Sequence, residues 1–84
     1  MNVKLLVNVC QPATGLSYDT YIPMNIRMDF VVDALSELFA RLSEGEFIGG
    51  RNTMLWNERQ QSFLDMGKTA AENEISGGDR LLLV

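Results

Sequence analysis

The sequence contains no histidine and only one cysteine, Cys10. Without imidazole, the chain lacks the usual general base near neutral pH, the Ser–His and Cys–His nucleophile pairs, and the most frequent metal ligand. One cysteine cannot close an internal disulfide, and alone it cannot hold a zinc ion or an iron–sulfur cluster. These absences predict a protein that is not an enzyme and that carries no cofactor or metal.

Long apolar runs are also missing. The longest is the four-residue run Leu81–Val84, whereas a membrane-spanning helix needs about 20 apolar residues. The N-terminus begins directly with a strand-like pattern, without the basic region, apolar region and cleavage site of a signal peptide. We therefore expect a cytoplasmic chain that does not insert into a membrane.

Clustered positive charge is the third missing feature. The 7 lysines and arginines are never adjacent, and the net charge is −4. Nucleic-acid binding requires a clustered basic face, so we expect no nucleic-acid partner. The 84 residues suffice for one domain, 1–84, and the apolar share of 46% is typical of globular proteins. With most catalytic, metal-binding, membrane-spanning and nucleic-acid-binding functions disfavoured, the composition favours a protein that acts by binding.

The N-terminal quarter of the chain has the pattern of a β-hairpin. Apolar and polar residues alternate over 3–10, where valines and leucines predict a strand, and they alternate again over 17–22. The segment 11–15 between them contains proline and glycine and predicts a turn. Pro23, which has no backbone donor, ends the second strand.

The next segment changes to a helical period. Apolar residues recur at steps of three and four and predict a helix over 28–43. Gly45 is expected to end this helix in the left-handed conformation. The apolar stripe consists of Met28, Val31, Val32, Leu35, Leu38, Phe39 and Leu42.

Three further strands are predicted after the helix, at 53–56, 61–65 and 80–84. In the first, we expect Met54 and Trp56 to face the core and Leu55 to face outward; the register of the second stays open between Phe63 and Leu64. The order β-β-α-β-β-β predicts an α+β fold in which one main helix crosses a mixed sheet. The first and last strands would lie side by side in the centre, which is the β-grasp arrangement.

The C-terminal segment carries a family resemblance. Ile75, Gly78, Asp79, Leu81 and Leu83 match the pattern I-x-x-G-D-x-L-x-L with which many ubiquitin-like domains close. The chain therefore resembles the ubiquitin-like superfamily. Within it, the stretch YDTYIP at 18–23, followed by a helix with the pair Val31-Val32, is most similar to the YukD/EsaB family of bacterial type VII secretion.

The resemblance implies a small protein–protein interaction module, an accessory part of the type VII system that supports export of WXG-motif proteins. Its partner would be the cytoplasmic portion of the secretion membrane machinery. A ubiquitin-like modifier or sulfur carrier is the alternative, but those proteins need a flexible Gly-Gly tail. The pairs Gly49-Gly50 and Gly77-Gly78 are internal, so we expect no conjugation.

The candidate partner-binding residues are large aliphatics that strand alternation places opposite the predicted core. They are expected to form one apolar patch across neighbouring strands. In the ubiquitin family this sheet face commonly binds partners, so the resemblance implies docking there. Self-association, or ordinary exposed aliphatics, stay open as alternatives. Cys10 is expected to be a half-buried hydrophobic residue without a basic neighbour. The patch residues are Leu6, Leu55, Leu82 and Val84.

Overall fold

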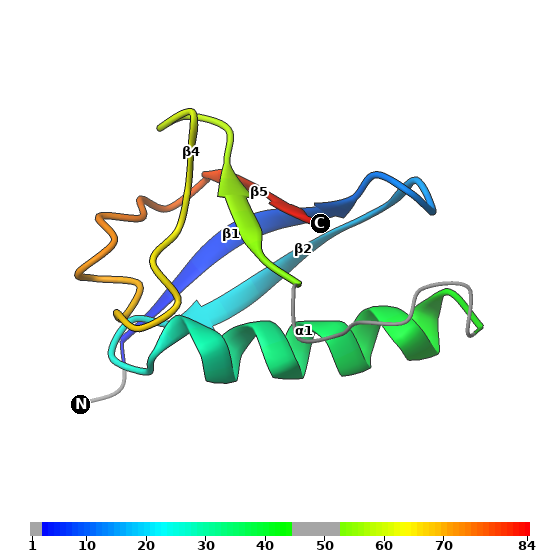
Figure 1. Cartoon of the computed structure of the whole chain (residues 1–84), viewed down its shortest axis with the longest axis horizontal. Helices are drawn as coiled ribbons and strands as arrows, with labels where there is room; N and C mark the ends of the chain where they lie inside the picture. Colours follow the sequence, from blue (N-terminus) through cyan, green and yellow to red (C-terminus); the bar gives the residue numbers. More distant parts are fainter. Residues whose placement is uncertain (1–2, 45–52) are drawn as a thin grey trace.

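In the described part of the chain, one helix packs across a five-stranded sheet (Figure 1). The computed structural model describes residues 3–44 and 53–84. The strands follow the order β2-β1-β5-β3-β4, with β1 and β5 parallel and the other pairs antiparallel. The predicted mixed sheet, with its first and last strands side by side, is confirmed. The elements are β1 (Lys4–Gln11), β2 (Leu16–Pro23), α1 (Met28–Leu42), β3 (Leu55–Asn57), β4 (Ser62–Phe63) and β5 (Arg80–Leu83).

The hydrophobic core lies between α1 and one face of the sheet. Burying each large aliphatic or aromatic side chain there contributes about 1.5–3 kcal/mol. Leu38 and Leu42, predicted on the same helical stripe, are instead partly exposed, so the buried stripe is narrower than expected. No helix within the described residues is long and apolar enough to cross a membrane. The helix buries Met28, Val31, Val32, Leu35 and Phe39 against Val7, Val9, Ile22, Leu55, Leu81 and Leu83.

The start of α1 is fixed by backbone rather than by a capping side chain. Arg27, the residue before the helix, makes no side-chain capping bond. Instead the carbonyls of Lys68 and Met66 accept from the N–H groups of Met28 and Asp29, at 2.8 and 3.0 Å. These bonds satisfy helix N–H groups that lack a partner within the helix. The long connection before β5 therefore anchors the helix, although no capping residue in the sequence marks this position.

Two turns depend on the left-handed backbone that glycine favours. Gly15, between β1 and β2, has φ 75°, and Gly78, before β5, has φ 87°. Gly15 lies in the turn predicted for 11–15, and glycine adopts this backbone without the steric cost of a side chain. At the end of α1 it is Glu44 that has a positive φ, of 55°, whereas Gly45, the predicted helix end, lies outside the described residues.

The inward face of β3 is the reverse of the prediction. Leu55, expected to face outward, is 0% exposed and belongs to the core, whereas Trp56 and Met54 are only half-buried. The cause is the pairing with β5, where Leu55 stands opposite Leu83, a core residue. Both faces of the sequence TMLW are apolar, so alternation alone could not choose between them. Of the two residues whose facing stayed open, Phe63 in β4 is exposed, whereas Leu64, which follows β4, is buried in the core.

Candidate protein-docking face

An apolar patch lies on the sheet face opposite α1. Cross-strand pairing places Leu82 beside Trp56, and Trp56 beside Phe63. The two aromatic rings meet edge to face, with centroids 4.9 Å apart at an interplanar angle of 81°. Phe63 is 51% exposed and Val84 49%. We call Trp56, Phe63, Leu82 and Val84 the sheet patch; solvated apolar clusters of this kind are typical of protein-binding surfaces.

A polar band borders the sheet patch. Asn8 on β1 stands between Asp19 on β2 and Arg80 on β5. The Asn8 side-chain amide donates to the Asp19 carboxylate at 3.1 Å. Arg80 in turn pairs with Glu58, with 3.6 Å between Nε and Oε2. The sheet patch therefore has a polar rim, which is the usual layout of a protein interface.

The predicted docking residues do not form one patch. Leu82 and Val84 belong to the sheet patch, whereas Leu55 is in the core, which makes its predicted place on the outward face wrong. Leu6 is exposed, but it pairs with Tyr21 on the far side of the polar band. Leu6 lies four residues from Cys10, the β1 partner of Leu82, so about 13 Å of strand separates the two leucines.

Two aromatic residues of the sheet patch were missed as binding residues. The sequence pattern favours Trp56 in the core, and it does not decide which way Phe63 faces. The alternation in β5, where Leu81 and Leu83 are buried, sets the face of β3 through pairing. The outward position of Trp56 can be predicted only when its pairing with Leu82 is known.

Cys10 lies on the outward side of β1 and is buried, more deeply than expected. Its neighbour across the parallel pair is Leu82. The Arg80 side chain contacts the thiol, and the hydrogen bond between them raises the pKa of Arg80 above its ordinary value. A basic neighbour is therefore present, contrary to the expectation from the sequence.

The buried carboxylate of Asp79 lies just before β5 and accepts hydrogen bonds from three neighbouring residues. It accepts from Arg59, from the Asn57 side chain at 3.0 Å and from the backbone N–H of Ser76 at 2.9 Å. The hydrogen bond from Arg59 is the main reason that the pKa of Asp79 falls to about 2. A general acid needs the opposite shift, so this cluster is arranged to hold charge and not to transfer a proton.

Metal binding has no cluster of ligands to support it in the part of the chain that the structure describes. Within 3–44 and 53–84, no group of three or more histidine, cysteine, aspartate or glutamate side chains could hold a metal ion. Among the described residues, the sheet patch is therefore the best candidate for a binding surface. Its chemistry suits a protein surface.

Comparison with known proteins finds similarity at the level of structure only. No family model matches the chain, and no curated protein matches it. The EccD5 ubiquitin-like domain from Mycobacterium xenopi superposes with a TM-score of 0.79 at 16% identity, covering 98% of this chain and 93% of that one. The ubiquitin-like domain of the Mycobacterium tuberculosis type VII secretion system protein ECCD1 has a TM-score of 0.76 at 14% identity, with 98% of each chain covered.

A third similar structure is a chain of the MycP5-free ESX-5 inner membrane complex. Its TM-score is 0.76 at 23% identity, and the match covers 96% of this chain but only 20% of that one. These likenesses show that the protein has the ubiquitin-like β-grasp fold, so the predicted fold class is confirmed. Two of the neighbours are named as ubiquitin-like domains, and none of the three names describes an enzyme. The closer resemblance to the YukD/EsaB family stays a prediction.

Proposed function

We propose that the protein is a non-catalytic interaction module of a bacterial type VII secretion system, which acts in the cytoplasm. Its partner would be the cytoplasmic part of the membrane machinery that exports WXG-motif proteins. The observation that carries the proposal is the sheet patch, a solvated apolar surface on a fold shared with the ubiquitin-like domain of a protein named as part of a type VII secretion system. Fold alone does not determine function, so the docking proposal rests on the residues of the sheet patch.

The composition of the sheet patch supports docking to another protein. Aromatic side chains are enriched at interfaces, and the Trp56–Phe63 pair offers a broad, rigid contact surface. Leu82 and Val84 extend this surface along β5 and its end. An interface built on these few residues would be small, and small interfaces are weak or transient. Such affinity suits an accessory component that associates and dissociates during transport.

The test is capture of the cytoplasmic domains of the secretion machinery by purified chain. We expect the double variant Phe63→Ser with Leu82→Ser to lose capture while it still folds, with a melting temperature lowered by several degrees because Leu82 is half-buried. The matched control is Leu6→Ser with Tyr21→Ser, which removes a similar exposed apolar pair on the other side of the polar band. Equal capture by the patch variant and the original chain would reject the sheet patch as the docking surface.

A covalent ubiquitin-like modifier or sulfur carrier is the competing class. Val84 is joined to Met54 by two backbone hydrogen bonds, of 3.0 and 2.8 Å. Modifiers act through an activated C-terminal carboxylate, so mass spectrometry of the protein from cells separates the classes. We expect an unmodified C-terminal carboxylate; a thiocarboxylate or an isopeptide adduct there would overturn the docking proposal.

A further inference from the structure

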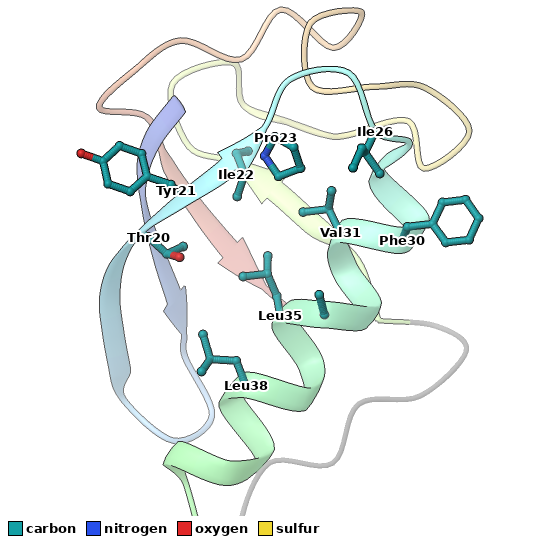
Figure 2. Close-up of a pocket in the computed structure, with 10 residues that line it drawn as sticks. Thr20, Tyr21, Ile22, Pro23, Ile26, Phe30, Val31, Leu35 and Leu38 are labelled. Atoms are coloured by element: carbon teal, nitrogen blue, oxygen red, sulfur yellow. The ribbon is translucent and has the colours of Figure 1, made fainter. Parts of the chain in front are cut away.

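A second apolar surface lies away from the sheet patch, between the edge strand β2 and α1. It is a groove of about 320 Å³ (Figure 2). Thr20 and Ile22 border it on the side of β2, and Leu38 points into it from α1. At its outer side Phe30 is 61% exposed, which is unusual for a phenylalanine. The proposed docking face does not use this groove.

A row of apolar side chains crosses the exposed side of α1 and leads into the groove. Its members follow each other at four-residue spacing, and residues at this spacing are neighbours on a helix surface. Figure 2 shows Phe30 pointing away from β2 and Leu38 pointing toward it, so the row runs obliquely across the helix. The apolar surface of α1 is therefore wider than the part that the sheet covers. We call Phe30, Ala34, Leu38 and Leu42 the helix row.

Ala34 makes a notch in the middle of the helix row. It is exposed, and its small methyl group lies between the large side chains of Phe30 and Leu38. Two helices commonly pack by fitting ridges of side chains at four-residue spacing into the grooves between such ridges. The notch can therefore receive a large side chain of a second helix without displacing any residue of the core.

A charged row runs beside the helix row on the solvent side of α1. Each of its members precedes a member of the helix row by one position, so the two rows are parallel. Arg41 contacts Glu37 at 3.9 Å, whereas the exposed Asp33 has no ion-pair partner within 3–44 and 53–84. Three carboxylates and one guanidinium make this row negative, and a cationic partner would complement it. The charged row consists of Asp29, Asp33, Glu37 and Arg41.

We propose that the helix row binds an amphipathic helix of a partner protein, which packs along α1 beside β2. The partner helix presents apolar side chains to the helix row and places one of them in the notch at Ala34. Lysine or arginine residues that flank its apolar side chains face Asp33 and Glu37. Apolar burial gives the affinity, and charge pairing decides on which flank the basic residues of the partner must lie.

The two parallel rows fit a helix and not a strand. On a helix, an apolar row and the neighbouring charged row reach the same side, and both repeat at steps of about 6 Å, as the rows of α1 do. In a strand, the residues between the apolar contacts point to the opposite side, away from Asp33 and Glu37. A strand therefore cannot contact the helix row and the charged row together.

A second copy of the chain fits this surface less well than a cationic helix does. When two α1 helices pair in antiparallel fashion, the same flank of each helix meets. The carboxylates of Asp33 and Glu37 would then face those of the other copy, and like charges at such positions are destabilising. The net charge of −4 adds to this repulsion. A basic flank on the partner removes it.

The test uses two capped peptides of identical leucine, lysine and alanine composition, each about 18 residues or roughly five helical turns long. In the first, the lysines flank a row of leucines; in the second, they lie on the face opposite the leucines. Each peptide is titrated into the isotope-labelled full chain and followed by amide NMR shifts. We expect saturable shifts at Phe30, Ala34 and Leu38 and none at Phe63. The first peptide should bind several-fold more tightly, because only its lysines reach the charged row.

The notch is tested by Ala34→Arg. This variant fills the notch from an exposed helical position and adds a charge that repels the lysines, so the first peptide should bind about tenfold more weakly or worse. Arginine is a good helix former, so α1 should persist. Ala71→Arg makes the same change at an exposed alanine outside the groove and should bind normally.

The charged row is tested by Asp33→Asn with Glu37→Gln. In this variant the two peptides should bind with equal affinity, because the carboxylates that distinguish them are gone. Glu58→Gln with Glu74→Gln removes the same amount of charge outside the groove and should keep the difference between the peptides. Loss of the difference in this control as well would reduce the effect to net charge and overturn the assigned flank.

Several results would overturn the proposal as a whole. They are an absence of saturable shifts, shifts confined to the sheet patch, unchanged binding by Ala34→Arg, and a bound peptide that is extended. Equal affinities of the original chain for the two peptides would do the same. Sedimentation of the chain alone tests the second copy, and a dimer that Ala34→Arg dissociates would assign the helix row to self-association instead.

This proposal and the docking proposal fail separately. The variant Phe63→Ser with Leu82→Ser should keep full binding of the first peptide, because neither residue lines the groove. Conversely, Ala34→Arg should keep capture of the secretion machinery through the sheet patch. Loss of peptide binding in the patch variant would show that the two surfaces are not independent, and would overturn the helix row as a separate site.

Discussion

Arg59 and Asp79 form a two-point ion pair at the edge of the core. The Nε of Arg59 donates to Oδ1 of Asp79 at 2.7 Å, and a second guanidinium nitrogen donates to Oδ2 at 3.0 Å. The Asp79 side chain is 4% exposed, whereas that of Arg59 is half exposed. Asn57, the last residue of β3, also donates to this carboxylate. The pair therefore joins the turn after β3 to the start of β5.

Replacing Asp79 should destabilise the fold. Asp79→Ala removes the acceptor for Arg59, for the buried Asn57 amide and for the Ser76 N–H. Leaving buried donors unpaired costs about 1–3 kcal/mol. Urea unfolding should report a loss in that range. Asp33→Ala, on the exposed side of α1, should change the unfolding free energy by less than about 0.5 kcal/mol, and similar losses for both variants would argue against a structural role for the cluster.

The same carboxylate should make stability depend on acid pH. The hydrogen bond from Arg59 lowers the pKa of Asp79 to about 2 in the folded state, from an ordinary value of 3.8. A lowered folded pKa adds stability above pH about 4, and that stability is lost as the pH falls toward 2. The contribution is on the order of 1–2 kcal/mol, because solvent around Arg59 screens the pair. Thermal melts between pH 7 and pH 2 should therefore show a smaller acid loss in Asp79→Asn than in the original chain.

Leu55 in β3 and Leu82 in β5 offer a matched test of the two sheet faces. Leu55→Ala empties a fully buried position and should cost about 2–5 kcal/mol. Leu82→Ala makes the same chemical change on the half-buried outward face and should cost roughly 1 kcal/mol. Urea unfolding of both variants measures the difference. Equal losses would contradict the observed inward face of β3.

Trp56 should report docking without any added label. It is the only tryptophan in the sequence, and it lies half-buried within the sheet patch. A partner that covers the sheet patch removes water from the indole, so emission should shift to shorter wavelength and acrylamide quenching should fall. An unaltered Trp56 spectrum with a bound secretion partner would place that partner elsewhere.

The strands and the helix were largely predictable because their signals are local. Alternation in β1 and in β5 and the period of α1 come from single stretches of chain, and the structure confirms each within a residue or two. The inward face of β3 was not predictable, because Met54, Leu55 and Trp56 are all apolar. The start of α1 at Met28 was predicted, but its bonding was not, since the acceptors are backbone carbonyls of the distant residues Lys68 and Met66.

The candidate docking surface shows the same division. The sequence identified Leu82 and Val84 as outward aliphatics, and their role in docking stays a prediction. It could not pair them with Trp56 and Phe63, because those contacts depend on which strands are neighbours and in which register. Nor could it show that the Asn8 band separates Leu6 from the sheet patch.

By itself, the sequence determined the order of the elements, the fold class and, through the absence of histidine, the poor prospects for most catalytic chemistry. Those properties depend on residue type and on spacing along one stretch of chain. Tertiary structure alone decided which face of β3 is solvated, how Asp79 is bonded, and where β2 and α1 leave a groove. Surfaces are assembled from residues far apart in sequence, and strand register decides which of their side chains meet.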